Sequence, residues 1–308
     1  MRQDCVNANN NCRSCANCSI FESIYRPIDY WWKHYDELRL YPELKSKQGT
    51  FTQGTFLCEG EGIEYSFIPT KVMFDTETVL IELYKDVRTM DHKVALCNEV
   101  FYTSKIEGAN STLLATQEIY DGRPLDRNNW CSESMIKGGF EATKYLNVIG
   151  NKVTIDSLIK MWNILVDGCC DNQSIRGDKF RIGNVQVGNH VGLNWQCLDD
   201  AMSNWVDYYN SPILSDHPFI KACILHFSFE FIHPFCDGNG RAGRLLLNNF
   251  LIKEGFDKIK AISFSRVIEQ DKSAYYNALN SGDNVYTDCT GFIQYMLNIM
   301  LDAFYAVI

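Results

Sequence analysis

The stretch HPFCDGNGRAGR, residues 233–244, lies between two segments that are apolar on nearly all sides, 219–232 and 245–252. Such segments are typical of helices at the centre of a bundle. The Gly-Asn-Gly run between them is a strong turn signal, so it predicts a sharp connection between two buried helices. The end of the stretch therefore lies at the N-terminus of the second helix.

The residue types in this stretch match what a phosphate-binding site needs. A helix N-terminus presents unpaired N–H groups and the positive end of the helix dipole, which together attract anions. Gly238 and Gly240 let the backbone approach phosphate oxygens closely, and Asn239 adds a neutral side-chain donor. Arg241 and Arg244 are three residues apart, so we expect them on one helix face, both directed at phosphate oxygens.

Two further residues indicate catalysis in addition to anion binding. Asp237 places a carboxylate beside the expected phosphates, which favours a divalent cation such as Mg²⁺ between them. His233 precedes the turn and has the side chain most often used as a general base near neutral pH. An ordinary turn with solvated arginines and a structural histidine is the alternative. The whole set falls within one turn, which favours a phosphoryl-transfer site.

The same twelve residues resemble the signature H-P-F-x-[D/E]-G-N-G-R-x-x-R of the Fic (filamentation induced by cAMP) proteins, with no departure at a fixed position. The flanking apolar segments look like the two central helices of that family, and the resemblance extends over roughly residues 90–285. It implies an all-α, Fic-type helical bundle with a short inserted β-hairpin flap, preceded here by an irregular N-terminal extension.

The resemblance implies protein adenylylation, in which AMP passes from ATP to a Ser, Thr or Tyr hydroxyl of a target protein and pyrophosphate leaves. It gives His233 the role of catalytic base and Asp237 that of Mg²⁺ ligand. The residues that it assigns to the phosphates of ATP are Gly238, Asn239, Gly240 and Arg241 for the α- and β-phosphates and Arg244 for the γ-phosphate. Positioning and charge stabilisation carry most of such a reaction, in agreement with the residue types.

A second motif precedes this stretch in the same chain. TSKIEGAN matches the inhibitory signature [S/T]-x-x-x-E-[G/N] of the Fic proteins through Thr103, Glu107 and Gly108. By itself the motif is typical of a helix end with a solvated glutamate and a glycine cap. Together with the first signature it implies an inhibitory helix over about residues 91–108, in which Glu107 competes with the ATP γ-phosphate for Arg244.

The helical pattern is interrupted over about residues 177–192, GDKFRIGNVQVGNHVG. Apolar residues at a spacing of two predict short strands here, with Gly183-Asn184 as the turn between them. By resemblance this hairpin is the family's target-positioning flap, and its docking edge is shaped by Gly183, Val187 and Gly188. A hairpin that only decorates the surface is the alternative.

We expect the chain to have two parts. Residues 1–70 form the N-terminal extension, with a cysteine-rich tail over 1–18, an aromatic-rich segment and a small hairpin. Residues 71–308 form the Fic-type core, which carries the inhibitory helix and the flap.

The chain has 13 cysteines, and four of them, Cys5, Cys12, Cys15 and Cys18, cluster near the N-terminus. Their overlapping C-x-x-C spacing allows a zinc ion or an iron–sulfur cluster. Zinc sites usually bring two such pairs from separated segments, and the sequence contains no second pair. A reduced tail without metal is therefore the favoured interpretation.

Composition limits the remaining function classes. A net charge of −9 argues against a nucleic-acid or membrane-surface binder, since either needs a basic field. The polar N-terminal sequence lacks the apolar core of a signal peptide, and the most apolar stretch is too short to span a bilayer. We expect a cytoplasmic enzyme that uses ATP and Mg²⁺ and modifies a target protein with a reactive hydroxyl, or itself. A homo-oligomer is left open.

Two other functions stay open at this point. Some relatives use the inhibitory glutamate to activate water for removal of AMP, so Glu107 also fits a de-adenylylating hydrolase. A nucleotide-sensing, protein-binding module is the alternative outside enzymes, although a sensor has no need for a base at His233.

Overall fold

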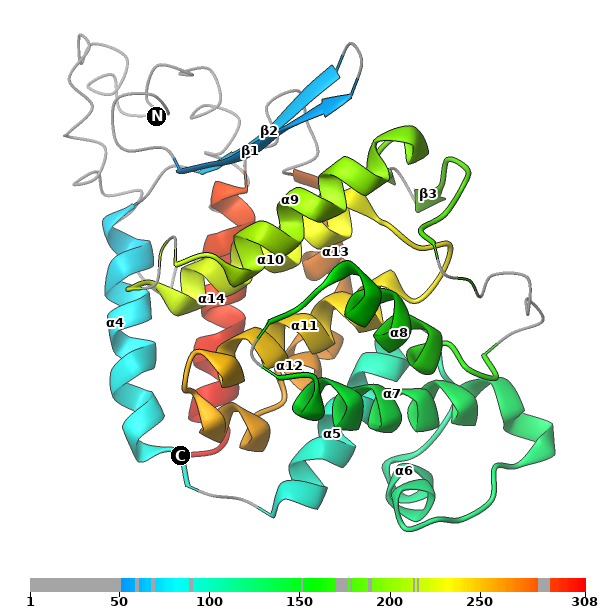
Figure 1. Ribbon diagram of the computed structural model, residues 1–308. Helices are drawn as coiled ribbons and strands as arrows, with labels where there is room; N and C mark the ends of the chain where they lie inside the picture. Colours follow the sequence, from blue (N-terminus) through cyan, green and yellow to red (C-terminus); the bar gives the residue numbers. More distant parts are fainter. Residues whose placement is uncertain are drawn as a thin grey trace, which may run out of the picture.

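The computed structural model describes residues 51–308, except 59–60, 68–69, 89–90, 151, 170–176, 178, 188–189, 213, 215 and 282–288 (Figure 1). The helices are α4 (Lys71–Asp86), α5 (His92–Ile106), α6 (Leu113–Tyr120), α7 (Trp130–Val148), α8 (Ile155–Leu165), α9 (Leu198–Asn210), α10 (Pro218–Ile232), α11 (Asn239–Lys253), α12 (Phe264–Gln270), α13 (Lys272–Ser281) and α14 (Thr290–Tyr305). The strands are β1 (Phe51–Cys58), β2 (Glu61–Phe67), β3 (Gln186–Val187) and β4 (His190–Val191). The predicted all-α fold with a short inserted hairpin is confirmed.

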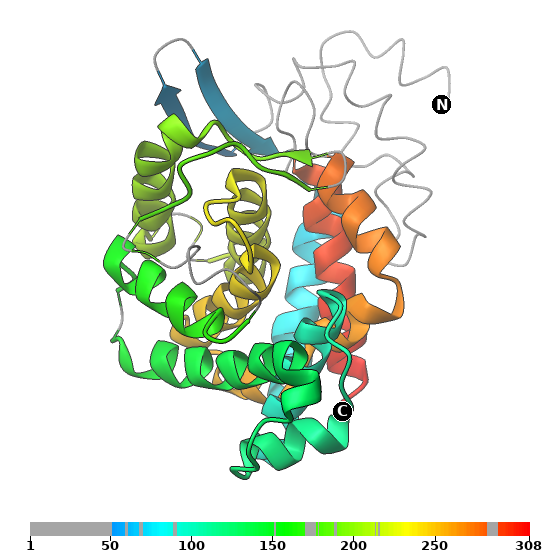
Figure 2. The same ribbon diagram turned by 90° about the vertical axis from the view of Figure 1, so that its right-hand side faces the viewer.

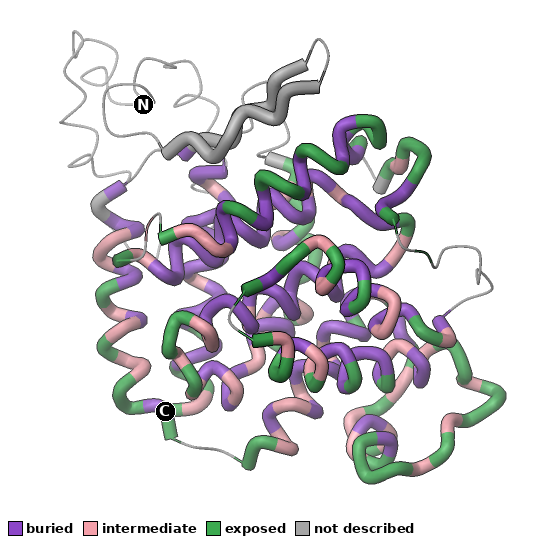
Figure 3. Tube along the Cα trace, in the orientation of Figure 1, coloured by how far each residue is buried: buried purple, intermediate pink, exposed green. Residues whose placement is uncertain are grey.

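Helix α10 occupies the centre of the bundle, with α9 on one side and α14 on the other (Figure 2). Its residues are apolar on almost every side, and Phe219, Ile220 and Ile224 are wholly buried. Helix α11 follows it and packs against it over more of its length than any other helix does. Figure 3 shows buried residues gathered in these central helices, while exposed residues lie on the outer faces of α4, α6 and α9. Removal of this apolar surface from water is the main force that holds the two helices in place.

The N-terminus of α10 is fixed by a carboxylate from α4. Glu77 is buried, and its Oε1 accepts the backbone N–H groups of Phe219 at 2.8 Å and Ile220 at 3.1 Å. Its Oε2 lies 2.8 Å from Nδ1 of His217. The first N–H groups of a helix have no acceptor inside the helix. Glu77 supplies the acceptor for two of these groups in α10.

The helix expected over about residues 91–108 is present as α5, and a buried glutamate binds it to α12. Glu99 accepts hydrogen bonds from the Ser263 hydroxyl at 2.7 Å, the Ser265 hydroxyl at 2.5 Å and the Ser265 N–H at 3.2 Å. An exposed ion pair, Lys105–Glu269 at 2.9 Å, joins the same two helices. These contacts hold α5 against α12.

The inserted hairpin differs from its sequence prediction in the position of its turn. β3 and β4 pair antiparallel, with Gln186 opposite Val191 and Val187 opposite His190, so Gly183-Asn184 does not connect the two strands and its prediction as the turn was wrong. The physical reason is a hydrogen bond from Arg181, whose Nη1 donates to the Gly183 carbonyl at 2.6 Å. The backbone of this arm is therefore bound to an arginine side chain and cannot fold back as a two-residue turn.

The small hairpin expected in the N-terminal extension, over residues 54–68, is present as the antiparallel pair β1–β2. The N-terminal cysteines Cys5, Cys12, Cys15 and Cys18 lie outside the described residues. Within the described residues, none of the helices combines the length and the apolar character needed to cross a membrane.

Candidate active site

The connection between α10 and α11 is held in one shape by two left-handed residues and one amide. His233 ends α10 with φ 52°, and Gly238 precedes α11 with φ 79°. The Asn239 side chain accepts the Phe235 N–H at 2.9 Å and donates to the Phe235 carbonyl at 2.8 Å. The sequence predicted that this amide faces phosphate, whereas both of its polar atoms close the loop. What Asn239 offers an anion is its backbone N–H.

A tryptophan on α8 supports the same loop. The rings of Trp162 and Phe235 stack with centroids 4.4 Å apart and planes within 2° of parallel. The Trp162 Nε1–H donates to the Asp237 carbonyl at 2.8 Å. Both rings are buried, so the loop rests on a rigid floor.

His233 stands at the edge of this loop as a neutral imidazole. Burial is the main cause that lowers its pKa to about 4. Its Nδ1 lies 3.3 Å from the Glu230 carbonyl oxygen, which can only accept a hydrogen bond. Nδ1 therefore carries the ring proton, and Nε2 has the free lone pair. Near pH 7 this histidine can accept a proton through Nε2.

The first turn of α11 provides the expected anion-binding end. Its N–H groups have no acceptor inside the helix. A Cβ at Gly240 would collide with Oε1 of Glu107 and lie 3.1 Å from Nη1 of Arg244, so a larger residue here would displace the Glu107 carboxylate from its present position. Asp237 lies at the rim, with its side chain 47% exposed and Oδ1 accepting the Gly238 N–H at 2.6 Å.

The two arginines of α11 diverge, although the sequence predicted that both face the phosphates. Arg241 is buried beneath the loop, where Nη1 lies 3.4 Å from the Leu165 carbonyl and 3.5 Å from Sγ of Cys169. Its Nη2 lies 3.9 Å from Oδ2 of Asp237. From this position Arg241 could act on a bound anion only through its charge, from behind the loop.

Arg244 points to the C-terminal end of α5. Its Nη2 lies 2.5 Å from Oε1 of Glu107 and 3.2 Å from the Thr103 carbonyl, and its Nε donates to the Thr103 hydroxyl at 2.8 Å. Nη1 is buried without a partner among the described residues. Burial is the largest single influence and disfavours the charged guanidinium, but the charge and hydrogen bond of Glu107, together with the nearby Tyr275 and Glu230, raise the pKa of Arg244 above its usual value.

The residues of the inhibitory signature meet at this arginine. Glu107 caps the C-terminus of α5, and its side chain is 28% exposed, so one side of the ion pair opens to solvent. Gly108 has φ 88°, a conformation that a residue with a side chain rarely adopts. The chain turns away there and leaves the Glu107 carboxylate over Gly240.

A buried polar cluster lies beneath His233 and Arg244, and the sequence predicted none of it as a unit. Nε2 of His226 lies 2.8 Å from the Tyr275 hydroxyl, and Nδ1 lies 3.9 Å from Oε1 of Glu230. Burial lowers the pKa of His226 to about 3 and raises the pKa of Glu230 to about 8. Both groups are therefore uncharged near pH 7, next to a charged arginine.

An apolar cavity of about 380 Å³ opens beside His233. Its walls come from β4, α10 and α13, and its lining residues are His190, Phe227, Glu230, Phe231, His233, Tyr276, Leu279 and Asn280. The sequence prediction missed this cavity. A weak signal existed, because Tyr276 and Asn280 are four residues apart and so share a face of α13.

The flap residues are only partly described. Gly183 is exposed and its carbonyl binds Arg181, Val187 lies in β3, and Gly188 lies outside the described residues. Ile182 and Val191 on the two arms are exposed, at 79% and 59%. Exposed apolar side chains such as these are suited to contact another protein.

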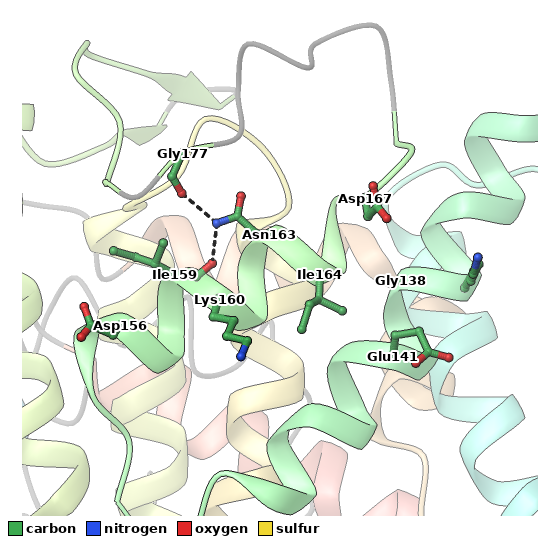
Figure 4. Close-up of a pocket in the computed structure, with 10 residues that line it drawn as sticks. Gly138, Glu141, Asp156, Ile159, Lys160, Asn163, Ile164, Asp167 and Gly177 are labelled. Carbon is green, nitrogen blue, oxygen red and sulfur yellow. Dashed lines mark hydrogen bonds between the residues drawn. The ribbon is translucent and has the colours of Figure 1, made fainter.

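A second cavity, of about 540 Å³, lies between α7 and α8 and shares no residue with this site (Figure 4). The amide of Asn163 crosses it, donating to the Ile159 carbonyl at 3.0 Å and the Gly177 carbonyl at 2.7 Å. Its charged lining residues are two lysines and three carboxylates: Lys137, Lys160, Glu141, Asp156 and Asp167. Among the described residues, no three His, Cys, Asp or Glu side chains are grouped to hold a metal.

Comparison with known proteins adds the family context. Residues 152–251 match the Fic/DOC family. Protein adenylyltransferase Fic of Drosophila willistoni is 32% identical over 216 residues, which cover 64% of this chain and 41% of the relative. The protein of the same name from Nematostella vectensis is 28% identical over 212 residues, covering 66% and 47%. The chain therefore matches less than half the length of these relatives.

Solved structures agree on the fold. A Fic family protein from Desulfovibrio desulfuricans aligns with a TM-score of 0.64 at 22% identity, over 76% of this chain and 72% of that chain. Fic-1 from C. elegans aligns with a TM-score of 0.63 at 20% identity, over 77% and 72%. The arrangement of helices around α10 and α11 is thus shared with these proteins.

Proposed function

Because residues 152–251 match the Fic/DOC family, we propose that this chain belongs to that family and is an autoinhibited protein adenylyltransferase. One observation carries the proposal: the neutral His233 stands between an apolar cavity and the anion-binding end of α11. The relatives named protein adenylyltransferase support the same reaction. The substrate is ATP, and the acceptor is a Ser, Thr or Tyr hydroxyl of a target protein.

The site offers separate places for the two ends of ATP. The cavity has the size and the aromatic walls that suit an adenine ring, with Asn280 as a polar partner at its rim. The phosphates then extend over Gly238 to Gly240 toward Arg244. There they receive backbone N–H groups, the helix dipole and the charge of Arg241 beneath the loop.

The reaction is in-line attack on the α-phosphorus. The target hydroxyl oxygen forms a bond to this phosphorus, the bond to the oxygen that bridges to the β-phosphate breaks, and pyrophosphate leaves with that electron pair. The hydroxyl proton passes to Nε2 of His233, which releases it later to solvent. The Glu230 carbonyl keeps the ring oriented through Nδ1. Positioning and proton removal are thus assigned to groups that the fold already holds in place.

Asp237 fits the role of the Mg²⁺ ligand. It is the half-exposed carboxylate at the rim of the anion-binding end, and protein Mg²⁺ sites often combine one or two carboxylates with substrate phosphates. The ion would neutralise phosphate charge during the transfer.

Glu107 keeps the enzyme at rest. Its carboxylate accepts a hydrogen bond from Nη2 of Arg244 and lies over Gly240. It therefore neutralises the positive charge that the γ-phosphate would use. ATP with its γ-phosphate displaced presents the α-phosphate poorly to an incoming hydroxyl. A buried arginine–carboxylate pair is only marginally favourable against its desolvation, so it can be exchanged for another anion.

The flap presents the target. Its two arms carry exposed apolar side chains next to His233, and a short strand edge can pair with an extended segment of another chain. Gly183, Val187 and Gly188 are the flap residues we assign to this edge. The target is a second protein or a hydroxyl of this chain itself.

The test is the Glu107→Gly variant incubated with ATP and Mg²⁺, with intact-mass analysis for adenylate adducts. We expect the rate of self-modification to rise about 10- to 100-fold, because a charge-assisted hydrogen bond of about 1.5–3 kcal/mol is removed. The matched control is Glu254→Gly. Glu254 also caps a helix C-terminus before a left-handed glycine, Gly255, but is exposed and far along α11. Equal adduct levels in wild type and Glu107→Gly would exclude the autoinhibition.

Removal of AMP is the second candidate activity. The partly exposed Glu107 carboxylate lies over the anion-binding end, where it can orient a water molecule toward a bound AMP group. Incubation of wild type and Glu107→Gly with an adenylylated protein separates the two activities. Release of AMP by wild type alone would assign hydrolysis to Glu107.

A further inference from the structure

Arg181 lies at the base of the flap and binds the backbone around His233. Its Nε donates to the His233 carbonyl at 2.7 Å, and Nη2 lies 3.3 Å from the Ile232 carbonyl. Its own backbone N–H donates to the Pro234 carbonyl at 3.0 Å. One residue thus contacts three consecutive carbonyls where α10 ends and the active-site loop begins.

The same guanidinium also holds both arms of the flap. Nη1 donates to the Gly183 carbonyl at 2.6 Å on the first arm, and Nη2 donates to the Leu193 carbonyl on the second. The second arm passes close above it: a Cβ at Gly192 would lie 3.0 Å from Nη2 of Arg181 and 3.2 Å from Cβ of His233. Both arms are therefore joined to His233 through one side chain.

The composition of this contact set is unusual. Arg181 is 5% exposed, yet it forms no ion pair with a carboxylate of the described residues. Burial of an unpaired guanidinium is costly, and here it lowers the pKa of Arg181. Carbonyl groups alone offset the lost hydration. A hydrophobic residue here would leave these carbonyls without a donor, so the guanidinium is what joins the two arms to the end of α10.

We propose that Arg181 is a positioning residue that locks the flap to the catalytic histidine, so that a target hydroxyl held by the flap meets Nε2 of His233. Lysine cannot replace it, because a single ammonium cannot reach carbonyls that lie on both arms and on α10. The role in catalysis rests on the proposed adenylyl transfer, whereas the lock itself is a property of the fold.

The charge of Arg181 has a separate effect on His233. The groups that act on this imidazole besides burial are the Glu230 carbonyl and Glu107, which raise its pKa, and His190 and Arg181, which lower it. Removal of the Arg181 charge therefore raises the pKa of His233, while a lysine in its place leaves that effect intact. Geometry and charge can thus be separated by two substitutions.

The experiment compares Arg181→Lys and Arg181→Gln in the Glu107→Gly protein, with Arg127→Gln as the matched control at an exposed arginine of the 3₁₀ turn Arg127–Asn129. Three quantities are measured: the NMR titration of the His233 ring, the hydrogen exchange of the Gly192 amide, and kcat and KM for adenylyl transfer. The Gly192 amide is suitable because it donates to the Val185 carbonyl across the flap at 3.0 Å.

We expect faster exchange at Gly192 in both variants, with the amides of α14 unchanged. The His233 titration moves to higher pH in Arg181→Gln only. kcat falls by about tenfold or more in both variants, because misplaced reactants lose alignment, while KM for ATP stays within about twofold.

Unchanged exchange at Gly192 in folded Arg181→Lys and Arg181→Gln overturns the lock. Equally faster exchange throughout the protein also overturns it, since Arg181 would then serve only stability. A loosened flap with unchanged kcat overturns the positioning role. If the Glu107→Gly protein transfers no AMP at all, the proposed function fails, and the titration and exchange results still decide the lock.

Discussion

The active-site turn is held from two sides by contacts of different kinds. On the α5 side, Arg244 is held mainly by the carboxylate of Glu107 at 2.5 Å. On the flap side, Arg181 binds only carbonyls, among them His233 at 2.7 Å. A phosphate group competes directly with a carboxylate for a guanidinium, but it does not replace backbone carbonyls inside the protein. The first side is therefore suited to be exchanged and the second to stay fixed.

His233 lies between the two sides, and its substitution is the largest change that we expect. His233→Ala in the Glu107→Gly background should lower the rate of adduct formation by about 100- to 10 000-fold, because the general base is lost. Intact-mass spectrometry over time measures the rate. His92→Ala is the control, since His92 is an exposed histidine at the start of α5. Substantial activity without His233 would show that this residue is not the general base. The contacts of Arg181 with His233 would then have no role in the reaction.

Thr103 sharpens the α5 side. Thr103→Val removes the hydroxyl that accepts from Nε of Arg244 at 2.8 Å, while it keeps the volume of a buried side chain. We expect about a fivefold rise in self-adenylylation with Glu107 intact, because the arginine is held by fewer contacts. Thr103→Ser retains the hydroxyl and should behave as wild type. If Thr103→Val lowers the activity instead, this hydroxyl orients Arg244 for ATP.

Substitution of Glu230 tests the buried polar cluster beneath His233 and Arg244, and it has the smallest expected effect. Its pKa is raised to about 8, so the folded protein keeps it protonated where the unfolded chain ionises it. The stability that it contributes is full below about pH 4.5 and is lost as pH rises through about 8.

Glu230→Gln should flatten this dependence. We expect Tm between pH 6 and pH 8 to fall by about 2–4 °C less than in wild type, measured by thermal unfolding in buffers of equal ionic strength. Glu141→Gln is the control, because Glu141 is a half-exposed carboxylate of α7 paired with Lys144. Parallel curves for wild type and Glu230→Gln would mean that Glu230 is ionised in the folded protein.

The sequence prediction succeeded where chemistry and local spacing coincide. The apolar segments around residues 233–244 predicted two central helices, and α10 and α11 are those helices. The sequence prediction failed where a side chain forms hydrogen bonds with a nearby backbone group that no motif indicates. The Asn239 amide was expected to face phosphate and instead closes the loop on Phe235.

The turn of the flap and the directions of the two arginines of α11 were also predicted incorrectly, because their side-chain partners could not be read from the neighbouring sequence. Gly183-Asn184 has the composition of a hairpin turn, yet Arg181 binds the Gly183 carbonyl, and the strands pair further along the chain, with Val187 opposite His190. Spacing alone placed Arg241 and Arg244 on one face, but a difference of three residues is enough to send one side chain under the loop and the other toward α5.

The sequence by itself determined the helical class, the turn between α10 and α11, and the set of groups available for the proposed adenylyl transfer. These follow from hydrophobic period and residue chemistry, which act over a few neighbours. Only the tertiary structure decided the partners of those groups. Glu107 meets Arg244 across 137 positions, and Arg181 meets His233 across 52. Such contacts depend on how whole helices pack, and helix packing is set by the sum of many weak apolar contacts that no short motif contains.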